Sequence, residues 1–240
     1  MLFTSLSTAV TVFLSLSSSV SAVPVVTRAT NLNTLAGILP QSDLPKPDGL
    51  ELKYVLLGIG TQNYTCTTGN ATAAPGTTGA VAKLYDLGTR LNADPMAQWK
   101  INTISGLALS LSTYGNWLDS YLKLEGYNEW LGNHFFTKAD ATTNYPTFSL
   151  NKVKATPYPL AMVSKKDAFD APKTSCPGAK NEGAVPWLRL VDDKNLSVGG
   201  VNTVYRLETA GGKSPATCKG QKESFEVSYA AQYWVYGPKA

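Results

Sequence analysis

Histidine and cysteine are scarce in this chain, and so is charge. His134 is the only histidine among 240 residues, which excludes any zinc site built from two imidazoles. The three cysteines form no Cys-x-x-Cys pair, so a thioredoxin-like site and a zinc knuckle are excluded as well. Charged residues make up 16% of the chain, well below the roughly 25% of an average globular protein. The polar surface must therefore come mainly from Ser, Thr, Asn and Gly, as is typical of extracellular proteins.

Two further absences narrow the range of partners. The net charge is +4 and the 21 basic residues are scattered, so the clustered basic stripe of a nucleic-acid-binding protein is missing. Beyond the first 22 residues, no run approaches the roughly 18 consecutive apolar residues of a membrane-spanning helix. We therefore expect no nucleic-acid partner and no membrane span.

The N-terminal segment 1–22 has the features of a secretory signal peptide. It is almost free of charge, carries an apolar run at 9–14 and ends in Val20-Ser21-Ala22. This ending is a small-x-small pattern that signal peptidase accepts. We predict cleavage after Ala22 and a secreted, extracellular product.

Three N-glycosylation sequons agree with export; they begin at Asn63, Asn70 and Asn195. Asn70 and Asn195 lie among turn-forming residues, where a glycan would reach solvent. Asn63 follows an apolar run and is expected to be partly buried. The sequence thus predicts a glycoprotein, with Asn70 and Asn195 as the better acceptors.

The cysteines fit an oxidising compartment. Cys66, Cys176 and Cys218 allow one disulfide and one free thiol, with three possible pairings. A bridge from Cys218 to either of the others would close a loop of at least 42 residues. The chain-entropy model assigns such a bridge roughly 4 kcal/mol of stability.

The sequence predicts a Pro-rich lead-in over 23–49, followed by one β-rich domain over 50–240. Its 43% of hydrophobic residues are enough for a packed core. Short β-type runs separated by Gly, Pro and Asp predict an antiparallel sandwich or barrel. In the last run, 225–236, apolar residues alternate with period two, so one face is expected in the core and the other half-exposed. The expected strands are 52–66, 80–86, 146–150, 187–191, 201–209 and 225–236.

One stretch, around 95–125, departs from the β pattern. Asp94-Pro95 resembles a helix N-cap followed by proline at the first helical position. Apolar residues then recur every three or four positions, which predicts an amphipathic helical insertion packed on the sheet. Gly115 is a point at which the helix could divide. The apolar positions are Leu107, Leu111, Tyr114, Leu118, Tyr121 and Leu122.

Two features suggest a cofactor-binding or catalytic site, but neither is accompanied by the other residues that such a site needs. The run Gly58-Ile59-Gly60 begins like a dinucleotide-binding loop, but Asn63 stands where the third glycine belongs and no helix follows. A bulged central strand is the favoured interpretation. His134 lies beside two phenylalanines, and no Gly-x-Ser-x-Gly elbow accompanies it, so a hydrogen-bonded packing residue is favoured over a general base. No metal site and no cofactor are predicted.

Aromatic residues on β-type segments offer a better indication of binding. Trp234 and Tyr236 share the face opposite the expected core, where exposed rings can stack on sugars or apolar ligands. Arg206 stands inside an apolar run and is expected either to pair with a carboxylate or to line a pocket.

Six runs in this order resemble an uncharacterised domain family of secreted fungal and bacterial proteins, domain of unknown function 3455. The resemblance extends from about residue 45 to the C-terminus, and it implies that the helical segment is an insertion. It also favours a Cys66–Cys218 bridge, because fungal relatives often carry cysteine at these positions. The six runs are GIGTQNYTC (58–66), AKLYD (82–86), LGNHFF (131–136), VPWLRL (185–190), VYRLETAGG (204–212) and YAAQYWVY (229–236).

The resemblance supplies no catalytic residues. Fungal members often carry the label malate dehydrogenase, which the incomplete glycine motif and the expected export do not support. The shared runs imply instead a common structural or ligand-lining region, made of His134, Trp187, Arg206, Gly211 and Gly212.

We therefore expect a secreted β domain that binds a small molecule, a glycan or a cell-wall component. An aromatic groove of Tyr64, His134, Trp187 and Arg206 would form the site, with Tyr233 and Trp234 as further candidates. A secreted hydrolase using His134 as general base is the first alternative, and an NAD-dependent dehydrogenase is the second and disfavoured one.

Overall fold

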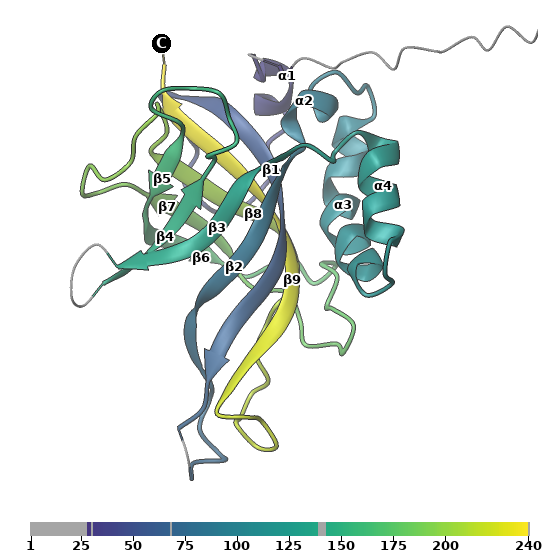
Figure 1. Cartoon of the computed structure of the whole chain (residues 1–240), viewed down its shortest axis with the longest axis vertical. Helices are drawn as coiled ribbons and strands as arrows, with labels where there is room; N and C mark the ends of the chain where they lie inside the picture. Colours follow the sequence, from purple (N-terminus) through teal and green to yellow (C-terminus); the bar gives the residue numbers. More distant parts are fainter. Residues whose placement is uncertain (1–27, 30, 68, 139–142, 240) are drawn as a thin grey trace, which may run out of the picture.

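The computed structural model describes residues 28–29, 31–67, 69–138 and 143–239 (Figure 1). The predicted signal peptide lies outside these residues. The strands are β1 (Leu50–Thr65), β2 (Gly76–Asp86), β3 (Trp130–Lys138), β4 (Asn144–Ser149), β5 (Leu160–Met162), β6 (Ser164–Phe169), β7 (Trp187–Val191), β8 (Thr203–Gly211) and β9 (Ser224–Pro238). The helices are α1 (Asn33–Ala36), α2 (Gly88–Leu91), α3 (Ala97–Ser112) and α4 (Trp117–Glu125).

All the strands belong to one antiparallel sheet, in the order β5-β4-β3-β2-β1-β9-β8-β7-β6. Its two edge strands, β5 and β6, are separated in sequence only by Val163. The Val163 N–H donates to the Pro146 carbonyl of β4 at 3.1 Å, and the chain then crosses to pair with β7. The sheet therefore curls until its edges nearly meet, and the predicted antiparallel β fold is confirmed as a nearly closed barrel.

Alternation along the strands separates two hydrophobic cores. In β9, Tyr229, Ala231 and Tyr233 point into the barrel, whereas Trp234 and Tyr236 point outward. The outward face was expected to be half-exposed, and that expectation was wrong. Trp234 is 0% exposed and Tyr236 is 2% exposed, because the lead-in and the helices cover this side of the barrel.

Helices α3 and α4 form the predicted helical insertion, between β2 and β3; α3 lies against β1, β8 and β9, and α4 packs on α3 (Figure 1). The helix begins at Ala97 rather than after Asp94, and it breaks around Gly115 as expected. The predicted apolar face is right in α4, where Leu122 is buried and Leu118 and Tyr121 pack against the core, and wrong before it, since Leu107 and Tyr114 are exposed. Among the described residues, no helix combines the length and apolarity needed to cross a bilayer.

The helix face that packs on the barrel carries smaller side chains than the sequence pattern suggested. It consists of Ala97, Ile101, Ile104, Ser105, Ala108 and Leu109. The Gln232 side chain of β9 fixes the helix in place by donating its Nε2–H to the Ile101 carbonyl at 2.6 Å.

The glycines of β1 reflect close packing rather than a bulge. The strand runs through Gly58 and Gly60 without a register shift. A Cβ at Gly58 would overlap the Tyr233 ring on the neighbouring strand. Glycine at this position therefore makes room for a large aromatic side chain inside the barrel.

The lead-in belongs to the outer core although its described residues before β1 form no strand. Leu32, Leu35 and Leu44 are buried against the barrel, and the Tyr205 hydroxyl donates to the Pro45 carbonyl at 2.6 Å. A disulfide joins Cys66, just after β1, to Cys218, just before β9, as the resemblance implied. Cys176 keeps a free thiol and is half-buried beside α3.

Candidate functional site

The barrel is open at the seam where β4 and β6 do not pair, and a cavity of about 630 Å³ lies there. This volume falls within the range of small-molecule sites, which is roughly 300–1,000 Å³. The lining comes from strands far apart in sequence, so only closure of the barrel creates the site. The residues around it include Gln62, Tyr64, Phe136, Tyr145, Val163, Lys165, Ala168, Leu188, Leu190 and Arg206.

Arg206 is the principal charged group of the cavity wall. On β8, its neighbours Tyr205 and Leu207 face the outer core, so Arg206 faces the barrel interior. Its Nε and Nη2 groups both donate to the Pro186 carbonyl, at 3.1 and 2.8 Å. Among the described residues no carboxylate forms an ion pair with it. The half-buried guanidinium thus retains unused donors beside an open cavity.

Gln62 adds a second unused donor to the same wall. Its side chain is 6% exposed, and its Nε2 makes no well-formed hydrogen bond to a described residue, although it lies near enough to the Tyr229 hydroxyl to oppose the rise in that phenol's pKa. A buried amide without a partner costs free energy, which a ligand could recover by accepting from it.

The charged groups that the structure describes in the cavity lining have one sign. Arg206 and Lys165 are its cations, and no described lining residue is acidic. The positive field of Arg206 also reaches Tyr64: burial raises the pKa of that phenol, and the guanidinium opposes the rise. The cavity is therefore suited to a ligand with negative charge.

The tyrosine hydroxyls near the cavity are already engaged. Tyr64 lines the cavity and donates to the Gly212 carbonyl at 2.7 Å. Tyr229 and Tyr233, both fully buried, share a hydrogen bond of 2.8 Å. Burial raises the pKa of each of these two phenols, so both stay neutral. They provide a rigid polar base inside the barrel rather than groups free to bind.

His134 lies inside the barrel but does not line the cavity. Its ring stacks on Phe148 at 4.2 Å between centroids and is 5.6 Å from Phe136, which does line it. The imidazole is 3% exposed, and its Nδ1 is 3.0 Å from the Thr147 carbonyl. Burial lowers the pKa of His134 to about 4. A neutral imidazole enclosed in this way favours a packing role over that of a general base.

The two tryptophans among the candidates face away from the cavity. Trp187 and Trp234 belong to the outer core and are 2% and 0% exposed. The Trp234 indole donates to the Gln232 side chain at 3.3 Å, beneath helix α3. Of the six candidates, the structure brings Tyr64 and Arg206 to the cavity and places His134 and Tyr233 in the core behind it.

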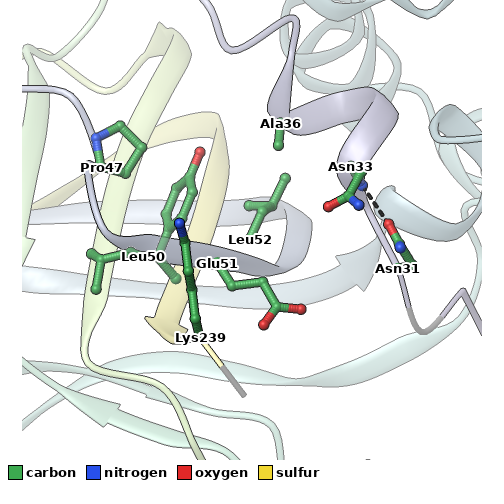
Figure 2. A pocket seen from close by; sticks show the side chains of 9 residues that line it. Asn31, Asn33, Ala36, Pro47, Leu50, Glu51, Leu52 and Lys239 are labelled. Atoms are coloured by element: carbon green, nitrogen blue, oxygen red, sulfur yellow. Dashed lines mark hydrogen bonds between the residues drawn. The ribbon is translucent and has the colours of Figure 1, made fainter.

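A second hollow, of about 470 Å³, lies between the lead-in and the ends of β1 and β9 (Figure 2). Glu51 and Lys239 stand together on one side of it, and Asn31 and Asn33 lie on the other. Tyr236 also lines it, and its buried hydroxyl has no partner among the described residues. Because this hollow carries charges of both signs, its lining does not indicate the charge of a ligand, whereas the lining of the barrel cavity does.

The other sequence features take ordinary positions. Asn70 and Asn195 are exposed in loops, whereas Asn63 is half-buried within β1. The run 58–63 is paired on both sides inside the antiparallel sheet, so it is not followed by a helix N-terminus that could hold a phosphate. Within the described part of the chain, no group of three or more His, Cys, Asp or Glu side chains could hold a metal ion.

Sequence reasoning missed several residues of the cavity, notably Gln62, Phe136, Lys165 and Leu188. Gln62 carried a usable signal, because it shares the inward phase of β1 with Tyr64 and is polar among apolar neighbours. Lys165 of β6 and Leu188 of β7 carried none, since both strands meet the seam only through long-range closure.

Fold and cavity together define an antiparallel β-barrel with a partly apolar pocket at its open seam, whose described charged groups are all positive. Residues 47–237 match the family described as Protein of unknown function (DUF3455), and the chain belongs to that family. Neither the curated proteins nor the solved structures gave a significant match.

Proposed function

We propose that this domain is a binding protein that holds a small molecule in the cavity at the barrel seam. The observation that carries the proposal is the pairing of two unused donors, the Arg206 guanidinium and Gln62 Nε2, on the wall of one open cavity. Polar groups within a mainly apolar pocket are the usual arrangement of a ligand site. Among the candidate partners, a small molecule suits a recess between strands better than a cell-wall polymer does.

A cavity-blocking variant tests this function. Ala168 lines the cavity and is exposed, so Ala168→Trp places a large ring in the opening without entering the core. The matched control is Ala155→Trp, at an exposed position that does not line this cavity. The measurement is a thermal-shift screen of the full-length secreted protein against a broad small-molecule library, with hits confirmed by native mass spectrometry.

We expect at least one ligand to raise the melting temperature of the wild type and of the control Ala155→Trp. The same ligand should have no effect on Ala168→Trp. A library with no hit, or hits that stabilise the blocked variant equally, would count against the cavity as a binding site.

We also propose that the protein is secreted and glycosylated. The Cys66–Cys218 disulfide and the exposed Asn70 and Asn195 support this, together with the signal-peptide features of 1–22. Mass spectrometry of the product from a eukaryotic secretion host provides the test. We expect a mature N-terminus at Val23 and glycans at both asparagines, whereas an uncleaved, sugar-free intracellular product would refute the proposal.

A further inference from the structure

We infer that the ligand of the barrel cavity is an apolar molecule carrying a single negatively charged group of the carboxylate type. The inference rests on the binding function proposed above and specifies the chemistry of its ligand. Arg206 would hold the anionic group, and the walls of the seam would hold the apolar body.

Arg206 is the anchor because no described residue compensates its charge. Two of its five N–H donors contact the Pro186 carbonyl, and no described residue supplies a carboxylate to it. A half-buried cation surrounded by apolar groups is unfavourable without a counter-charge. A bound anion would supply that charge, and the planar guanidinium matches a carboxylate with two parallel hydrogen bonds.

Gln62 extends the same polar patch. Its Nε2, which makes no well-formed hydrogen bond to a described residue, can donate to an oxygen of the ligand, and an amide donor adds no charge of its own. The other cation of the lining, Lys165, is exposed. With one half-buried guanidinium and one neutral donor, the interior suits one negative charge and does not suit a polyphosphate.

The buried part of the remaining wall is mainly apolar, whereas the polar side chains Thr77, Thr78 and Asn144 of the lining are exposed and Ser164 is half-buried. Phe136, Val163, Leu188 and Leu190 line the cavity, and Val163 is completely buried at the point where the chain crosses from β5 to β6. These side chains offer no hydrogen bonds to a sugar ring, whereas they would favour burial of a hydrocarbon.

A ligand series of equal chain length isolates the charge. Octanoate, octanol and octylammonium, each below its micelle-forming concentration, are titrated into the full-length secreted protein by calorimetry at pH 7.5. Hydrogen bonds to a charged group predict that octanoate binds roughly ten- to a hundredfold more tightly than octanol. Octylammonium should bind more weakly than octanol, because its charge has the sign of Arg206.

Variants of Arg206 test whether this residue causes the preference for octanoate over octanol. Arg206→Gln should lower octanoate affinity roughly ten- to a hundredfold while leaving octanol affinity unchanged. Arg206→Lys keeps the charge but removes the two-pronged geometry, so an intermediate loss is expected. Lys123→Gln is the control, since it makes the same change in net charge on the exposed surface of α4, outside the cavity.

The outcomes separate this inference from the proposed function. Three outcomes would refute an anionic ligand while leaving the cavity as a binding site. They are equal binding of octanoate and octanol, tighter binding of octylammonium, and an octanoate preference that survives in both Arg206 variants. Absence of binding by the whole series would overturn the inference as well, and the library screen with Ala168→Trp would then decide the binding function separately. If Arg206→Gln does not fold, the wild-type series and Arg206→Lys still decide the inference.

Discussion

The buried imidazole of His134 should make the stability of this protein depend on pH between about 4 and 6.5. In the folded chain the pKa of His134 is lowered to about 4, from 6.5, because burial disfavours the charged ring. The unfolded chain therefore takes up a proton at His134 below pH 6.5, whereas the folded chain does so only near pH 4. Since the unfolded state binds more protons between these values, stability is complete above pH 6.5 and is lost as pH falls.

The expected loss follows from the two pKa values. Between pH 7.5 and pH 5, His134 alone should lower the free energy of unfolding by about 2 kcal/mol, and by about 3 kcal/mol near pH 4. His134→Asn removes the titration while keeping a donor near the position of Nδ1, which contacts the Thr147 carbonyl at 3.0 Å. The variant should be less stable than the wild type at pH 7.5, and the difference should shrink toward pH 5.

Urea unfolding followed by tryptophan fluorescence at pH 7.5, 6 and 5 measures this difference directly. Because the chain has one histidine, a proton NMR titration also reports its pKa without assignment. Parallel pH profiles for wild type and variant, or a folded-state pKa near 6.5, would refute the burial argument and restore His134 as a candidate general base.

Three further changes test the packing, a buried acid and the disulfide by the same unfolding assay. Gly58→Ala should destabilise by roughly 1–3 kcal/mol, since the new Cβ overlaps the Tyr233 ring, and a neutral effect would show that the ring can move. Burial raises the pKa of Glu208 to about 7, so ionising this side chain costs stability as pH rises from 4.5 to 7. The free energy of unfolding of Glu208→Gln relative to wild type should therefore be roughly 1–3 kcal/mol higher at pH 8 than at pH 4.5. A difference between variant and wild type that does not change with pH would contradict this. Replacing Cys66 and Cys218 by serine should cost roughly 4–5 kcal/mol, because the bridge spans 152 residues, and a loss below 1 kcal/mol would show that it constrains the unfolded chain little.

The long central strands could be predicted from sequence because their patterns are local. The alternation in 225–236 corresponds to β9 (Ser224–Pro238), and the apolar run with glycines corresponds to β1 (Leu50–Thr65). Strand β6 (Ser164–Phe169) was missed because three of its six residues are charged, as suits the edge of a sheet. Strand β5 has only three residues and carries no pattern of its own.

The candidate site was predictable only in part. Arg206 stood out as a charge within an apolar run, and Tyr64 follows the inward phase of β1. Trp234 was assigned to the wrong kind of surface, because period two identifies two faces but not what covers each of them. The helices and lead-in that cover Trp234, and the seam that creates the cavity, depend on contacts between distant parts of the chain.

The most direct test of the central claim is to locate a bound anion by NMR. With ¹³C-labelled octanoate and full-length protein, isotope-filtered NOE spectra report which side chains contact the alkyl chain. The account predicts contacts to the ring of Phe136 and the methyl groups of Leu188, at the seam of the barrel. Contacts confined to Trp99, Trp117 and Leu124, which are exposed apolar residues of α3 and α4, would contradict it.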